Sequence, residues 1–261
     1  MSIEIFSGGE VDGLRRAGRV AAATLDRVQA ELRAGMSTAD INAIVIADTA
    51  ERGGTPSQLG YHGFTGAVCT SRNEVVCHGV PDAREVVVDG DIINVDVTTG
   101  IGGFHGDTSR TLLIGDVSAE ARFVVDVAQR CLYAGIAVVR HGASLGDIGA
   151  AILELARKQG CSVVRDFGGH GIGRTMHADP HVPHTGLKGR GLRLVKGMCI
   201  TIEPMINLGT ADVKVLADGW RVVTADGRLS AQFEHTILVT TDGAEILTPS
   251  SLAPTMLRPV T

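Results

Sequence analysis

Apolar residues recur every three or four positions near the start of the chain, the spacing of one face of an α-helix. This face comprises Val11, Leu14, Ala17, Ala21, Leu25, Val28 and Leu32. A second helix is predicted to begin after Ser37, because Asp40 follows it at the spacing of an N-terminal capping box. Gly53 and Gly54 are expected to end that helix.

The same pattern returns further along the chain. Helices are predicted to begin after Ser118 and after Ser144, and the second of these is expected to end at Gly160. The stretch 55–77 is expected to be rich in loops. Residues 86–114 are predicted to form a β-hairpin, because Ile92 to Val97 is rich in β-branched residues.

The predicted hairpin carries two acids. Three glycines between positions 99 and 103 suit a tight turn. A turn centred between Ile101 and Gly102 places Asp96 directly opposite Asp107. Two bare carboxylates this close repel each other and raise each other's pKa, so the pairing indicates a cation between them.

The chain contains an internal repeat. Residues 33–41 resemble residues 140–148, and the offset of 107 positions also relates Gly53 to Gly160 and Asp96 to Glu203. We therefore predict an α/β (α+β) fold with one catalytic domain, residues 1–261. Its two similar halves, about 10–114 and 118–245, each contain two helices followed by an antiparallel hairpin.

Each half contributes two acids. Glu203 and Glu234 lie among apolar residues, where an uncompensated charge is costly. His170, which has glycines on both sides, adds a nitrogen donor. Four carboxylates and one imidazole suit two divalent cations such as Co, Mn, Fe or Zn. Such a site predicts hydrolysis of an amide or of a phosphate ester.

Composition narrows the class of protein. The net charge of −5 and the 3% of aromatic residues disfavour a nucleic-acid-binding protein. No apolar run reaches 18 residues, and no secretory signal precedes the first helix. Five cysteines without a C-x-x-C pair fit a reducing compartment, so we expect a cytoplasmic protein without membrane contact.

Six motifs resemble those of type I methionine aminopeptidases over about residues 10–250. They are Asn73–Pro81, Asn94–Asp96, Gly106–Ser109, Gly169–Gly173, Thr201–Met205 and Gln232–Thr236. The resemblance implies the "pita-bread" fold, with two halves around a dinuclear metal site. It also implies removal of the initiator methionine from nascent chains whose second residue is small. The implied partners are nascent N-termini at the ribosome, and the expected state is a monomer.

The resemblance also implies the roles of individual residues. Asp96 would chelate one metal ion, Asp107 and Glu234 would bridge both, and His170 and Glu203 would complete the other shell. Glu203 would also shuttle a proton. The histidines that would contact the scissile peptide are His78 and His177, whose roles spacing alone leaves open. A monovalent cation would be held by Asn73, Val75 and Ser230.

The implied methionine pocket is where the chain departs from the family pattern. Its residues would be Tyr61, Phe64, Cys69, His78, Met176, His177 and Trp220. Phe64 replaces a common tyrosine, Gln58 a frequent cysteine and Met176 a common phenylalanine, while Ala178 stands where an acid is usual. The pocket is still expected to be apolar, because methionine is flexible and accommodates a thioether.

Chain length favours a short, bacterial-type enzyme of this family, and three alternatives stay open. About ten residues precede the first helix, too few for a zinc-finger extension, and the 26 positions from His177 to Glu203 are too few for the helical insertion of type II relatives. An X-Pro aminopeptidase or prolidase would share the fold but usually has a large N-terminal domain. A non-catalytic binding module of this fold would have lost metal ligands. A dinuclear phosphoesterase is the alternative that the residues leave open when the resemblance is set aside.

Overall fold

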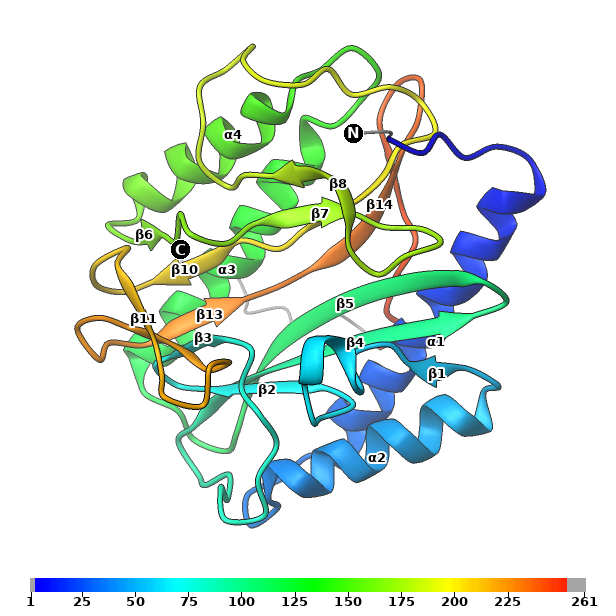
Figure 1. The fold of residues 1–261 in the computed structure, drawn as a ribbon. Helices are drawn as coiled ribbons and strands as arrows, with labels where there is room; N and C mark the ends of the chain where they lie inside the picture. The colour runs from blue at the N-terminus through cyan, green and yellow to red at the C-terminus, as the bar shows by residue number, and fades with distance from the viewer. Residues whose placement is uncertain (1–2, 253–261) are drawn as a thin grey trace.

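The computed structural model describes residues 3–252 and contains the four predicted helices (Figure 1). These are α1 (Gly9–Glu31), α2 (Thr38–Glu51), α3 (Ala119–Ala137) and α4 (Leu145–Lys158). The capping box at α2 is formed, because the Ser37 hydroxyl accepts from the Asp40 N–H and the Asp40 carboxylate accepts from the Ser37 N–H. None of the helices in the described part is long and apolar enough to cross a membrane.

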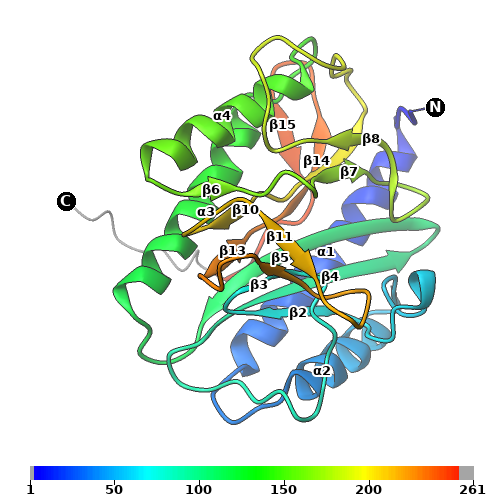
Figure 2. The same ribbon diagram turned by 60° about the vertical axis from the view of Figure 1, so that its left-hand side comes forward.

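The strands lie between the α1–α2 pair and the α3–α4 pair (Figures 1 and 2). The first half of the chain contains β1 (Thr55–Pro56), the 3-10 turn η1 (Tyr61–Gly63), β2 (Cys69–Arg72), β3 (Val75–Cys77), β4 (Ile92–Ile101) and β5 (Phe104–Leu113). The second half contains β6 (Ser162–Val163), β7 (Gly169–Gly171), β8 (Ala178–Val182), β9 (Cys199–Ile202), β10 (Met205–Asn207), β11 (Val213–Val215), β12 (Val222–Thr224), β13 (Ser230–Gln232), β14 (His235–Val239) and β15 (Ala244–Ile246).

These strands form four antiparallel sheets. β4 lies between β1 and β2 on one side and β5 on the other, and a five-stranded sheet has the order β15-β14-β9-β7-β8. β10 lies between β13 and β6, and β12 lies between β11 and β3. The stretch 55–77, expected to be loop-rich, thus contains three short strands that pair with distant segments.

Each helix pair covers its own apolar core. Leu25 of α1 and Ile41 of α2 pack with Val95 of β4, each fully buried. On the other side, Ile148 of α4 packs in a separate cluster with Ile200 of β9. Burial of such side chains contributes about 1.5–3 kcal/mol each. The strands that carry the acids are therefore fixed from both sides.

The predicted register of the first hairpin was wrong by two residues. Asp96 pairs with Ser109, and Asp107 pairs with Thr98. The turn is Gly102–Gly103, with φ of 59° and 82°, and Ile101 pairs directly with Phe104. A two-residue turn with both φ values positive matches the right-handed twist of the strands, which moves the centre of the hairpin by one position. A shift of two residues preserves the face, so Asp96 and Asp107 remain diagonal neighbours on one side.

Candidate metal centre

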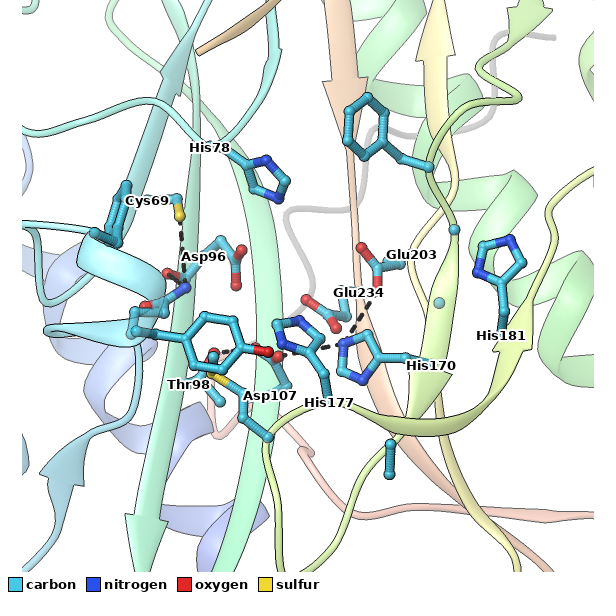
Figure 3. A pocket seen from close by; sticks show the side chains of 18 of the residues that line it. Cys69, His78, Asp96, Thr98, Asp107, His170, His177, His181, Glu203 and Glu234 are labelled. Carbon is cyan, nitrogen blue, oxygen red and sulfur yellow. Dashed lines mark hydrogen bonds and ion pairs between the residues drawn. The ribbon is translucent and has the colours of Figure 1, made fainter. Parts of the chain in front are cut away.

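The four acids and the histidine expected to hold metal line one cavity of about 450 Å³ (Figure 3). Asp96 comes from β4, Asp107 from β5 and His170 from β7. Glu203 lies in the gap between β9 and β10, and Glu234 in the gap between β13 and β14. The strands thus bring together residues that are up to 138 positions apart in sequence.

Three of these residues form the tightest group. Ligand atoms of Asp107, His170 and Glu234 all lie within 4.8 Å of one another. The His170 Nε2 atom is also 3.6 Å from Oε1 of Glu203 and 3.8 Å from Oδ2 of Asp107. The imidazole therefore faces the carboxylates across a space in which a cation can be bound.

The tautomer of His170 suits a metal ligand. Its Nδ1 atom lies 3.0 Å from the carbonyl oxygen of Gly171. A carbonyl only accepts hydrogen bonds, so Nδ1 carries the proton and Nε2 keeps its lone pair. A ligating histidine is commonly oriented in this way by its second nitrogen.

Hydroxyl and amide groups that the sequence analysis missed hold the carboxylates in place. Thr98 donates to Asp107 Oδ1 at 2.8 Å, and Thr201 donates to Glu203 Oε1 at 2.9 Å. Gln232 Nε2 donates to Glu203 Oε2 at 3.1 Å. Thr201 lies two positions before Glu203, and Gln232 lies two positions before Glu234. Because alternate residues of a strand share a face, this spacing was a signal from which both supporting residues could have been predicted.

Burial makes the ionised carboxylates costly. It raises the pKa of Asp107 to about 6, and it raises that of Glu203, which also faces the charge of Asp107, to about 8. The pKa values of Asp96 and Glu234 are raised further above their usual range, first by burial and then by neighbouring carboxylates. Burial, with a smaller effect from His177, lowers the pKa of His170 to about 3 and keeps it neutral.

The donor set fits divalent metal. Within residues 3–252, Oδ1 of Asp96 and Oε1 of Glu234 are buried without a hydrogen-bond partner. The described residues that line the cavity include no Lys or Arg that could balance the acids. Two divalent cations would neutralise the four carboxylates and coordinate both unpaired oxygens, which are the hard ligands that such ions prefer.

The predicted methionine-pocket residues line the same cavity. They are Tyr61, Phe64, Cys69, His78, Met176, His177 and Trp220. Phe64 packs edge-on against Trp220, with ring centroids 5.0 Å apart. Gln58 and Ala178 also line the cavity, as do Phe167 and His181, which the sequence analysis did not single out.

The two candidate catalytic histidines lie on either side of the acids. His177 is beside His170, with ring centroids 4.2 Å apart, and it also contacts Tyr61 at 5.0 Å. His78 has φ of +57°, an uncommon backbone conformation for a residue with a side chain, and its ring packs edge-on against Phe167. Burial lowers the pKa of His78 and, with the charge of His78 added, lowers that of His177 to about 4.

The residues expected to hold a monovalent cation lie outside this cavity's lining. The Asn73 carbonyl accepts from the Ser230 N–H at 3.0 Å, so these two residues are adjacent. The Ser230 hydroxyl is buried and has no hydrogen-bond partner among the residues described. Val75 lies in β3 and pairs with Val223 of β12.

Comparisons with known proteins agree with this geometry. The model of metallopeptidase family M24 matches residues 12–241. Methionine aminopeptidase B of Synechocystis sp. is 50% identical over 249 residues, which cover 94% of this chain and 91% of the relative. Methionine aminopeptidase of Escherichia coli (strain K12) is 42% identical over 251 residues, which cover 95% and 94%.

A solved structure shows the same fold. The crystal structure of methionine aminopeptidase from Rickettsia prowazekii superposes with a TM-score of 0.93 at 44% sequence identity. The match covers 95% of this chain and all of that one. Both the family model and the relatives span nearly the whole catalytic unit predicted from the sequence. The chain therefore belongs to metallopeptidase family M24 and, within it, to the methionine aminopeptidases, with their pita-bread fold.

Proposed function

We propose that this enzyme removes the initiator methionine from proteins and peptides whose second residue is small. One observation carries the proposal: Asp107, His170 and Glu234 converge within 4.8 Å in a cavity whose other wall is apolar and aromatic. A hydrolytic centre and a side-chain pocket therefore share one space. The names of the relatives do not favour the proline-directed or the non-catalytic alternative.

Five residues would hold two divalent ions, which could be Co, Mn, Fe or Zn. Asp96 would chelate one ion, Asp107 and Glu234 would bridge, and His170 and Glu203 would complete the second shell. Bound divalent metal supplies positive charge that lowers the pKa of water and polarises a carbonyl group. The proposal is supported by the unpaired oxygens of Asp96 and Glu234 and by the neutral His170.

Glu203 would move the proton. Its carboxyl group would accept a proton from water and donate one to the leaving amine. Thr201 and Gln232 hold its two oxygens, so the group has a fixed direction. A fixed carboxyl group between water and the scissile nitrogen suits hydrolysis of an amide.

His78 and His177 would hold the peptide. Both rings are neutral at pH 7 because burial lowers their pKa values, and a neutral imidazole carries one N–H donor. Such donors would bind the peptide group and stabilise negative charge on its carbonyl oxygen in the transition state. The methionine side chain would lie against Tyr61, Phe64, Cys69, Met176 and Trp220.

The remaining predictions concern the natural substrate, the compartment, the oligomeric state, a monovalent cation and the domain organisation. We propose that the substrates are nascent N-termini at the ribosome, in the cytoplasm, and that the enzyme acts as a monomer. A monovalent cation at Asn73, Val75 and Ser230 would brace β3 against β13; it is supported by the unpaired Ser230 hydroxyl. The single domain, residues 1–261, with repeats at about 10–114 and 118–245, also stays a prediction.

The test is release of free methionine by metal-stripped protein before and after addition of Mn or Co. We expect metal-dependent release from Met-Ala-Ser and little from Met-Leu-Ser, because a bulky second side chain would clash beside the metal centre. Turnover of a Gly-Pro peptide instead of Met-Ala-Ser would favour the proline-directed alternative. Absence of divalent metal binding at saturating concentration would favour a non-catalytic module.

A further inference from the structure

Asp96 lies where the partner strand of β4 changes from β1 to β2. β1 pairs with Gly100 and Thr99, whereas β2 begins to pair only at Asp96, opposite Cys69. Between these strands, the Ser57 N–H donates to the Thr98 carbonyl at 2.9 Å. The next carbonyl on this edge, that of Asp96, accepts from the side-chain amide of Gln58 at 3.1 Å. Asp96 also pairs directly with Cys69 of β2, so the amide adds a side-chain donor to this carbonyl at the point where β2 begins.

The orientation of the Gln58 amide follows from its partners. Its Nε2 atom lies 3.1 Å from the Asp96 carbonyl and 3.7 Å from Cys69 Sγ, so both N–H groups have acceptors. Turning the amide over would set its oxygen against another carbonyl oxygen, two acceptors with no proton between them. The residue is 7% exposed, and Oε1 has no hydrogen-bond partner in residues 3–252.

Gln58 also connects the metal centre to the pocket. Its backbone carbonyl accepts from the Tyr61 N–H at 3.0 Å, which fixes the turn that carries Tyr61. Its side chain lines the cavity beside Cys69. One residue therefore contacts two pocket residues and the backbone of Asp96 (Figure 3 shows Cys69 and Asp96).

We infer that Gln58 is a positioning residue, whose amide bonds to the Asp96 carbonyl and holds Asp96 in the direction required for metal binding. The inference rests on the proposed function of Asp96 as a ligand. A cysteine, which the resemblance makes frequent at this position, has only a weak S–H donor and cannot make the same bond.

The experiment is a calorimetric titration of metal-stripped protein with Mn²⁺. Gln58→Met keeps the side-chain length but removes the donor, and Gln58→Asn keeps the amide but is one methylene too short. We expect both variants to bind Mn²⁺ about 10-fold more weakly, the lower end of the loss seen when support of a ligand is removed. The matched control, Gln129→Met on α3, lines a different cavity and should leave the affinity unchanged.

A double-mutant cycle separates positioning from general destabilisation. In the Asp96→Ala background, Gln58→Met should cause no further loss of Mn²⁺ affinity, because the group that it supports is absent. An affinity within twofold of wild type in a folded Gln58 variant, or an equal loss in both backgrounds, would overturn the inference. If one Gln58 variant does not fold, the other decides. Metal binding is measured without substrate, so failure of wild type to release methionine would refute the proposed function and not this inference.

Discussion

The two strand pairs that carry the four acids are built differently. β4 and β5 have ten residues each and pair without interruption from Ile92 to Ile101. The other strands are broken at their acids, since Glu203 lies between β9 and β10 and Glu234 between β13 and β14. The unbroken pair carries the short aspartates, whereas the breaks carry glutamates, whose extra methylene gives them more reach. Continuous pairing can therefore hold the two aspartates rigidly. The positions of the two glutamates depend instead on the contacts that stabilise the breaks in their strands.

Hydrogen bonds from β5 hold one of these breaks. The Glu234 N–H donates to the Ser109 carbonyl at 3.0 Å, and the Thr108 hydroxyl donates to the Glu234 carbonyl at 2.9 Å. The Thr111 hydroxyl donates to the Gln232 carbonyl at 2.8 Å and accepts from the Gln232 N–H at 3.0 Å. The first pair of strands thus serves as the template on which the second is positioned.

The largest expected effect comes from removing either of the two carboxylates that are proposed to bridge the metals. Asp107→Ala and Glu234→Ala should each lower methionine release by roughly 10³-fold or more, because each would remove a ligand shared by both metals. Release from Met-Ala-Ser with saturating Mn or Co measures this. Asp242→Ala, an exposed acid outside the cavity lining, is the matched control. Substantial turnover by either bridging variant would contradict the assignment.

His177 tests whether metal binding and chemistry can be separated. Since it lies beside His170 but belongs to neither strand pair, His177→Ala should fold and bind Mn²⁺ like wild type. Its turnover should fall by about 10²-fold, the usual effect of losing one positioned donor. Steady-state kinetics together with a metal titration measure both properties. Kinetics close to wild type would show that His177 is a bystander.

The acids should also make the metal-free protein sensitive to pH. Glu203 has its pKa raised to about 8 by burial and then by Asp107, so between pH 7.5 and 8.5 this carboxyl group binds more protons in the folded state than in the unfolded chain. The free energy of unfolding should therefore fall as pH rises through this window. The buried histidines have lowered pKa values and act in the opposite direction near pH 6.5, where the unfolded chain still protonates them in part, but above about pH 7.5 they are neutral in both states.

Urea unfolding in the presence of a chelator, at pH 7.5, 8.0 and 8.5, measures this dependence. Saturating Mn²⁺ should reduce it, because metal compensates the ionised carboxylates in the folded state. A free energy of unfolding that stayed constant or rose with pH without metal would show that the acids are compensated by other groups.

A smaller effect is expected at the contact between the strand pairs. Thr111→Val keeps the shape of the side chain but leaves the N–H of Gln232 without its partner, while the Gln232 carbonyl keeps only the donor from Asn94 at 2.8 Å. Burying unpaired groups costs about 1–3 kcal/mol, so the free energy of unfolding should fall by roughly 2 kcal/mol. Thr241→Val, at an exposed position, is the control for denaturant unfolding. Equal stability of both variants would show that β5 does not hold the break.

The sequence predicted the parts of the molecule that depend on local chemistry. The helices followed from apolar spacing and from Ser37 with Asp40, and the four acids that meet in one cavity followed from their recurrence in both halves. The supporting contact between Thr111 and Gln232 could not be predicted, because it joins residues 121 positions apart and a threonine in a strand carries no signal of its partner. The Gln58 amide was missed for a related reason, since its role depends on where β1 ends and β2 begins.

The smallest effect concerns the turn that sets the register of the unbroken pair. Gly103 has φ of +82°, so Gly103→Ala should cost about 1–2 kcal/mol, whereas Gly102→Asn should cost little because asparagine followed by glycine suits this turn. Denaturant midpoints of the two variants measure the difference. The strand faces would survive either change, since only a slip of one residue would turn Asp96 and Asp107 away from the cavity. If Gly102→Asn were the more damaging variant, the turn would be of another type, and the pairing of Asp107 with Thr98 would need revision.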